Sequence, residues 1–329
     1  MPHKLDKIFY FFTFLISIIP IFLVVMLFSF LLYYSIPSIK YNGLKFFTSY
    51  YWYPGQVYLP PVNINGILVP YGSSFGILLF LYGTLITSLI ALIIAFPISI
   101  VVSLAVNLYV NEKFKKLIIS LIELFAAIPS VLYGLWGIVY LEPLLSNFIE
   151  PAMNKYLGFI PFFSGNIYSG AGILASSIIL CLMILPIMTS VINGSILNFS
   201  TSIKEGAIAL GATRYEMARF IILRGIKIQI FGAAMLGLGR ALGETMAVLM
   251  VSGSVFNIMP SNIYSPINTM AAALASLLDS AFMDSTGMNL YALSELGLTL
   301  MLITLAASLI GRFIVGLGII RGFTRGEEI

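Results

Sequence analysis

A charged pair lies deep inside a long apolar segment of the chain. Arg240 is about ten residues into the apolar run 229–252, and Glu244 follows it at position i+4. In a helix that rises about 1.5 Å per residue, Arg240 would be about 15 Å deep, near the centre of a bilayer. An arginine at that depth costs about 2.5–3.5 kcal/mol to insert, so it must face a protein interior or a wet cavity. Glu244 would share its helix face.

Two interpretations of this pair remain open. The two side chains could neutralise each other and serve structure alone. Alternatively, the planar guanidinium of Arg240 could bind an oxyanion, with Glu244 as its counter-ion while the site is empty. Ionisable residues inside membrane segments mark transport pathways by default, so we favour a substrate-translocation site at Arg240 and Glu244.

Other kinds of chemistry lack the residues that they need. The chain has one histidine, His3, and one cysteine, Cys181, which argues against a zinc site and a Ser-His-Asp triad. The sequence contains no GxxxxGK[ST] loop for ATP. We therefore expect no catalytic residue, no metal and no cofactor bound by this chain. Asp284 and Glu295 are interpreted as solvated charges.

A second candidate site lies in the longest basic loop. Ser202 with Glu205, and Thr213 with Glu216, each fit the S/T-x-x-E capping box that starts a helix. Gly211 lies between them, where a glycine can end a helix. The loop is predicted to form a short helix, a glycine turn and a second helix. The pattern leaves open whether this hairpin lies on the membrane or docks a cytoplasmic partner.

The elements that must position these residues are membrane helices. Of the 329 residues, 60% are hydrophobic and only 9% are charged, against about 25% charged residues in a soluble domain. A helix needs roughly 20 apolar residues to cross a bilayer. The segments that meet this need are 8–34, 77–108, 117–140, 171–192, 229–252 and 290–315. We predict an all-α, polytopic membrane protein with about six transmembrane helices, in which 268–278 forms a re-entrant or surface helix.

Basic residues orient these helices. Lys40, Lys45 and Lys155 fall on one side of the membrane, whereas most of the 17 Lys and Arg residues fall on the other. The latter are Lys4, Lys7, Lys113, Lys115, Lys116, Lys204, Arg214, Arg219, Arg224, Lys227, Arg312, Arg321 and Arg325. By the positive-inside rule, both termini are cytoplasmic in a cell-membrane protein, and 193–228 is a cytoplasmic loop. The net charge of +4 then reflects orientation and not a nucleic-acid partner.

The amino-acid sequence of the cytoplasmic loop resembles a known family motif. Glu205-Gly206-Ala207, with Gly211 six residues after Glu205, and then Ile221-x-Leu223, resembles the EAA loop of ABC-importer permeases. In that family the loop docks into a cleft of the ATPase subunit. The resemblance implies that Glu205, Gly206, Ala207 and Gly211 are ATPase-coupling residues.

A second resemblance covers most of the chain. Leu-Gly-Leu-Gly-Arg-Ala-Leu-Gly-Glu-Thr-Met-Ala-Val at 236–248 is similar to the signature of Pst-type phosphate-import permeases, in particular their C-type subunit. The strings at 123–137 and 82–89, and Trp52-x-Pro54, match as well. This family implies the type I ABC-importer permease fold (MetI-like). The first transmembrane helix and an external aromatic loop would occupy 1–76, and the permease core, with the docking loop 193–228, would occupy 77–325.

The resemblance also implies partners. The chain would be no enzyme but half of a phosphate translocation pathway, paired with a homologous A-type permease in the lipid membrane. Cytoplasmic ATPase subunits would drive it, and an extracytoplasmic phosphate-binding protein would deliver the substrate. The alternatives are a permease for another oxyanion, the A-type subunit itself, or, in a different class, a secondary anion transporter or channel.

Overall fold

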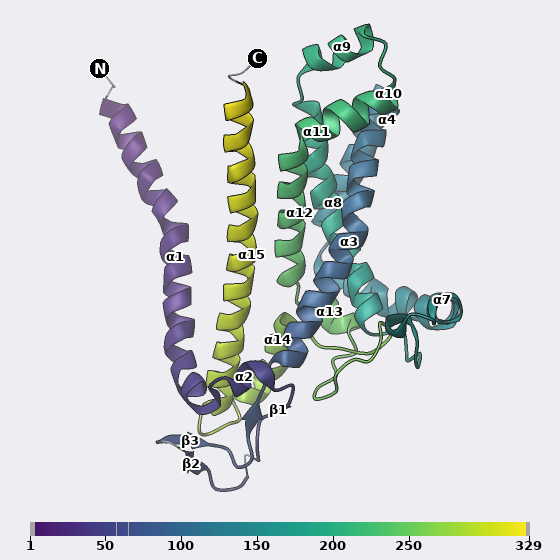
Figure 1. The fold of residues 1–329 in the computed structure, drawn as a ribbon. Helices are drawn as coiled ribbons and strands as arrows, with labels where there is room; N and C mark the ends of the chain where they lie inside the picture. Colours follow the sequence, from purple (N-terminus) through teal and green to yellow (C-terminus); the bar gives the residue numbers. More distant parts are fainter. Residues whose placement is uncertain (1–3, 57, 65, 327–329) are drawn as a thin grey trace. The chain divides into compact units, whose positions relative to one another are not determined.

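The computed structural model of the chain describes residues 4–56, 58–64 and 66–326 and is mostly helical (Figure 1). The helices that are long and apolar enough to cross a membrane are α1 (Lys4–Asn42), α3 (Leu78–Leu108), α8 (Ile173–Leu197) and α15 (Met288–Gly326). Two bent pairs of helices raise the number of candidate spans in the described chain from 4 to as many as 6. The predicted all-α architecture with about six spans is confirmed.

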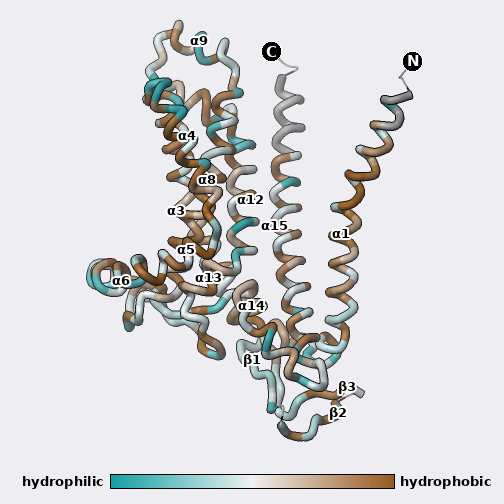
Figure 2. The backbone as a smooth tube through the Cα atoms, turned by 180° about the vertical axis from the view of Figure 1, so that it is seen from behind, coloured by the Kyte–Doolittle hydropathy of each residue, from teal (hydrophilic) through white to brown (hydrophobic). Residues whose placement is uncertain are grey.

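The first span is mostly apolar, as the predominance of hydrophobic colour in the middle of α1 shows in Figure 2. Large apolar side chains from Phe9 to Ile39 are exposed around it. A helix that is hydrophobic all round needs protein or lipid to cover it, which is the expected state of a membrane anchor.

The third span is bent and longer than predicted. α4 (Glu112–Ala127) is followed by a helical run over Ser130–Leu157, at an angle of 91° to it. Ile128 has an extended backbone (φ −65°, ψ 129°) because the ring of Pro129 disfavours helical conformations in the preceding residue. The prediction of one continuous helix over 117–140 is therefore wrong. The run contains α5 (Ser130–Trp136), η1 (Gly137–Leu141), α6 (Glu142–Leu144), η2 (Leu145–Ile149) and α7 (Glu150–Leu157).

The chain divides into two compact units. The first contains residues 1–77 and 277–302, and the second contains 78–276 and 303–329, so α15 contributes to both. In the first unit, two small antiparallel sheets follow α1, and Trp52 pairs with Phe75 in one of them. The added elements there are α2 (Lys45–Thr48), β1 (Trp52–Tyr53), β2 (Val62–Ile64), β3 (Ile67–Val69) and β4 (Ser74–Phe75).

The core of the second unit forms where α3, α8 and α12 (Lys227–Leu242) pack side by side (Figure 1). Ala91 and Ala95 of α3 are buried in one cluster with Ile184 and Met188 of α8. Gly237 of α12 lies so close to Met188 that an added Cβ would approach its sulfur to 2.8 Å. Small residues thus let the helices approach closely, as in many membrane bundles. The remaining elements are η3 (Pro161–Phe163), α9 (Thr201–Ala209), α10 (Arg214–Glu216), η4 (Met217–Ile222), α11 (Leu223–Gly225), α13 (Met246–Val251) and α14 (Met270–Ala281).

The short helix α14 begins inside the core of the second unit. Met270 is fully buried, and its backbone N–H donates to the side-chain oxygen of Thr84 at 2.9 Å. A Cβ on Gly83 would lie 2.2 Å from the carbonyl oxygen of Asn268, so only glycine allows this approach. The start of the segment predicted as a re-entrant or surface helix is therefore buried against α3.

Candidate functional site

The apolar segment that carries Arg240 is not one helix. α12 ends at Leu242, and α13 starts at Met246, so that Gly243, Glu244 and Thr245 lie between two helices. Glycine in a helix interior costs about 0.8–1.0 kcal/mol relative to alanine, which makes Gly243 a favourable place to stop. The prediction of one continuous helix over this segment is wrong. Arg240 and Glu244 therefore do not share a helix face, although they are four residues apart.

Glu244 instead caps the second helix of the pair. Its Oε1 accepts the backbone N–H of Ala247, with 3.4 Å between the two atoms. A carboxylate at the first turn of a helix is favourable because the free N–H groups there carry partial positive charge. Among the residues that the structure describes, no ion pair joins Glu244 to Arg240.

Arg240 lies in the last turn of α12 and is exposed. Its guanidinium is near enough to the Tyr133 hydroxyl for an electrostatic interaction. Tyr133 lies on α5 and donates to the carbonyl oxygen of Phe125 at 2.8 Å, across the bend between α4 and α5. Tyr133 belongs to the motif at 123–137, but sequence reasoning did not single it out. Within the described part of the chain, Arg240 thus presents a cation that forms no ion pair, at the end of α12.

Two glycines let α5 and η1 approach α13 closely. A Cβ on Gly134 would lie 2.7 Å from the sulfur of Met250, and one on Gly137 would lie 2.5 Å from a methyl carbon of Val251. Both partners are on α13. The backbones of α5 and η1 therefore pack directly against α13.

The predicted glycine turn in the cytoplasmic hairpin is confirmed. Gly211 has φ +85°, a conformation that side chains disfavour. The N–H of Gly211 donates to Ile208 O at 2.9 Å, and that of Ala212 donates to Ala207 O at 3.0 Å. This pair of bonds is a Schellman motif, which satisfies the free carbonyls at the end of α9.

One of the two predicted capping boxes is present. Thr213 accepts the N–H of Glu216, and the Glu216 carboxylate accepts the N–H of Thr213. The box predicted at Ser202 and Glu205 is wrong, because α9 begins at Thr201 and Ser202 is already helical. The helix starts earlier than the pattern predicts because the N–H of Lys204 already donates to Ser200 O.

The hairpin presents an apolar surface together with its predicted coupling residues. Glu205, Gly206 and Gly211 are exposed, whereas Ala207 is buried in the core cluster. A Cβ on Gly206 or Gly211 would meet nothing within 4 Å, so the space above both is open. The large exposed apolar side chains on the same segment are Ile203, Ile208 and Leu210. Such an exposed apolar patch is typical of a protein-binding surface.

An apolar groove runs along the bend between α4 and α5. It has a volume of about 820 Å³. α4 packs against α8, but none of its residues is fully buried, so much of its surface lacks cover within the chain. The groove is lined by Val102, Ile118, Ile122, Phe125, Ile128, Leu132, Tyr133, Trp136, Leu182, Leu185 and Pro186. It suits lipid or another helix and not a hydrated anion.

Two acidic side chains that were interpreted as solvated are buried in the first unit. Glu295 is 3% exposed and accepts hydrogen bonds from the side chains of Ser38 and Asn42 on α1. Asp284 accepts the backbone N–H groups of Thr286 and Asn289 at 2.8 and 3.0 Å, which caps the start of α15. The partners of Glu295 are on a distant part of the sequence and could not be foreseen, whereas those of Asp284 are local and were overlooked.

The sequence matches one protein family along most of its length. The model of the family "Binding-protein-dependent transport system inner membrane component" matches residues 95–317. "Phosphate transport system permease protein PstC 1" of Mycobacterium tuberculosis is 39% identical over 281 residues, which cover 84% of this chain and 83% of that protein. The PstC protein of Haemophilus influenzae is 34% identical, with 84% and 82% covered. A probable PstC protein of Methanocaldococcus jannaschii is 30% identical, with 88% and 87% covered.

Solved structures share the fold at lower sequence identity. A bacterial alginate ABC transporter in complex with its alginate pentasaccharide-bound periplasmic protein gives a TM-score of 0.56 at 16% identity, with 94% of both chains covered. The MetNI methionine ABC transporter in an inward-facing conformation gives 0.50 at 16% identity, with 72% of this chain and 93% of that chain covered. At this level of identity the likeness concerns the fold alone, and it confirms the predicted permease architecture.

Proposed function

The chain belongs to the family of binding-protein-dependent transport system inner membrane components, and we propose that it forms half of the translocation pathway of an ATP-driven phosphate importer. It is a multi-pass membrane permease subunit of a phosphate ABC importer. The observation that carries this conclusion is the 30–39% identity to phosphate transport permeases over most of the chain. The subunit would be the C-type permease, paired with a homologous A-type permease.

The ATPase would dock on the hairpin around α9. Glu205, Gly206, Ala207 and Gly211 are the coupling residues in this proposal. The exposed apolar side chains there and the open space above Gly206 and Gly211 support it, since both suit close approach by another protein. ATP hydrolysis would take place on those partner subunits.

Phosphate would pass the break between α12 and α13. Arg240 would contact it, because its guanidinium is exposed and has no carboxylate partner in the described chain. Phosphate carries about one to two negative charges near neutral pH and suits the planar fork of arginine. Glu244 completes this translocation site by fixing the start of α13 beside it.

The A-type permease would cover apolar surface that the chain leaves open. The groove at the bend of α4 and α5 and the uncovered faces of α4 support such a neighbour. The distribution of Lys and Arg favours cytoplasmic termini in the cell membrane, with the hairpin on the same side. The phosphate-binding protein would then meet the opposite face.

Reconstitution tests this function. The chain is co-expressed with the A-type permease and the ATPase of the same organism and placed in liposomes loaded with ATP. Radiolabelled phosphate and the purified binding protein are added outside. We expect phosphate uptake to require ATP. A non-hydrolysable ATP analogue should not support uptake. Equal uptake without ATP would indicate a secondary transporter or channel, and competition by sulfate or molybdate at equal concentration would indicate another oxyanion.

A further inference from the structure

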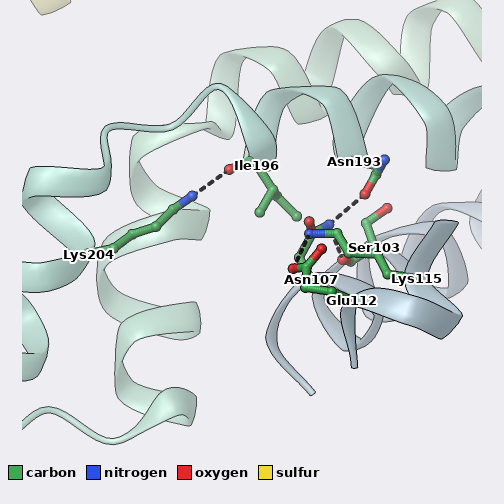
Figure 3. Close-up of polar contacts among 7 residues, drawn as sticks. All are labelled: Ser103, Asn107, Glu112, Lys115, Asn193, Ile196 and Lys204. Atoms are coloured by element: carbon green, nitrogen blue, oxygen red, sulfur yellow. Dashed lines mark hydrogen bonds and ion pairs between the residues drawn. The ribbon is translucent and has the colours of Figure 1, made fainter. Parts of the chain in front are cut away.

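Two basic side chains tie the docking hairpin to the ends of two membrane helices. Lys204 of α9 donates from Nζ to the carbonyl oxygen of Ile196 at 2.8 Å (Figure 3). Arg214 of α10 donates from Nη1 to the carbonyl oxygen of Leu108 at 2.9 Å. Ile196 is in the last turn of α8, and Leu108 is the last residue of α3.

Both contacts are built in the same way. Lys204 also lies over the ring of Phe199, 5.8 Å from its centroid, and Arg214 lies over the ring of Tyr109 at 5.9 Å. Tyr109 is the first residue after α3, and Phe199 is the second residue after α8. The last carbonyls of a helix lack intrahelical partners and carry partial negative charge, so a cation binds there favourably. Each cation therefore contacts both the end of a span and an aromatic ring within two residues of that end.

The two spans are also bonded to each other at this end. The Asn107 side-chain amide donates to Asn193 Oδ1 at 2.6 Å, and the Ser103 hydroxyl donates to Thr189 O at 3.1 Å (Figure 3 shows the Asn107–Asn193 bond). Asn107 directly precedes Leu108, which binds Arg214. Movement applied to either cation would therefore reach both α3 and α8.

The backbone next to α9 joins the hairpin to α8 but not to α3. Only residues 198–200 join α8 to α9, and they are outside regular structure. Arg214 and Leu108 are 106 residues apart in sequence, so the hydrogen bond is a link that the backbone does not supply. The apolar contacts of Ala207, Met217 and Ile222 with the core would still hold the hairpin in place without these cations.

We propose that Lys204 and Arg214 are positioning residues that transmit the movement of the docked ATPase to α8 and α3. This proposal rests on the proposed docking of an ATPase on the hairpin. It assigns the link between ATP hydrolysis and helix movement to two charge-assisted hydrogen bonds, which are stronger and more directional than apolar contacts.

The test compares transport with ATP hydrolysis in the reconstituted complex. Lys204→Met and Arg214→Met each remove the donor and keep an apolar side chain. Lys204→Arg and Arg214→Lys each keep a cation at the position. Lys116→Met removes an exposed cation from α4 and is the matched control. We measure ATPase co-purification, ATP hydrolysis, the melting temperature and the phosphate taken up per ATP. In the two methionine variants we expect the ATPase to remain bound and active, while phosphate per ATP falls by roughly fivefold or more, the lower range of coupling between distant sites. The cationic replacements restore it, and the control matches the unchanged chain.

Two outcomes would overturn the proposal. Either phosphate per ATP stays unchanged in both methionine variants, or uptake, hydrolysis and melting temperature all fall together, as for a purely structural role. Failure of the docking function itself looks different, because the unchanged chain would then neither retain the ATPase nor take up phosphate with ATP.

Discussion

The basic side chains of the hairpin and of the α12–α13 break differ in their contacts. In the hairpin, Lys204 and Arg214 each bind a helix carbonyl and lie over an aromatic ring. At the break, Glu244 binds the N–H of Ala247, and no ion pair of Arg240 is present among the residues that the structure describes. Cations with bonded partners hold elements together, whereas a cation kept open in an apolar segment is suited to bind a passing anion.

The largest expected effect on phosphate uptake comes from removing the positive charge of Arg240. Arg240→Gln should lower phosphate uptake by roughly 10- to 100-fold, since hydrogen bonds to charged groups contribute about 1.5–3 kcal/mol. Arg240→Lys keeps the charge without the planar fork and should be intermediate. Uptake is measured in complexes shown to contain every subunit. Normal uptake by Arg240→Gln in such complexes would remove Arg240 from the pathway.

A smaller effect is expected at the turn of the hairpin. Gly211→Ala places a side chain at φ +85° and should cost about 1–2 kcal/mol, which weakens ATPase binding by roughly tenfold. Gly211→Asn is the matched control, because asparagine tolerates this conformation better. Binding is measured by titrating purified ATPase onto the permeases in detergent. Equal affinities for both variants and the unchanged chain would show that the turn is not needed for docking.

A weak effect of a Glu244 substitution on phosphate uptake would support the contrast between the two regions. Glu244→Gln keeps an acceptor for Ala247 but loses the charge at the helix start, which is worth about 0.3–1 kcal/mol. Uptake should therefore fall by about fivefold or less, with a small drop in melting temperature. A loss as large as that of Arg240→Gln would instead support the original interpretation of Glu244 as a counter-ion.

The smallest expected effect concerns pH. Burial, and then the nearby Lys115, lower the pKa of Lys204 below its ordinary value. As pH rises through that lowered pKa, Lys204 loses its charge, and the phosphate taken up per ATP should fall. Lys115→Gln removes the repulsion, raises the pKa of Lys204 and should shift this decline to higher pH. Parallel pH profiles of the two proteins would show that the decline has another cause.

Local patterns predicted part of the candidate site correctly. The Thr213 capping box and the Gly211 turn formed as predicted, because both depend on hydrogen bonds within a few residues. The box at Ser202 failed although it has the same pattern. There the N–H of Lys204 already donates to Ser200 O, so the helix begins before Ser202.

The amino-acid sequence by itself determined the membrane class, the approximate number of spans and the permease family. Span length and hydropathy are properties of continuous segments, so they can be read without any long-range contact. Only the tertiary structure decided that the segment around Arg240 breaks, that Glu295 is buried against Ser38 and Asn42, and that Arg214 reaches Leu108. These outcomes depend on which residues meet across large sequence separations, and a buried polar group takes its role from the partner that it finds there.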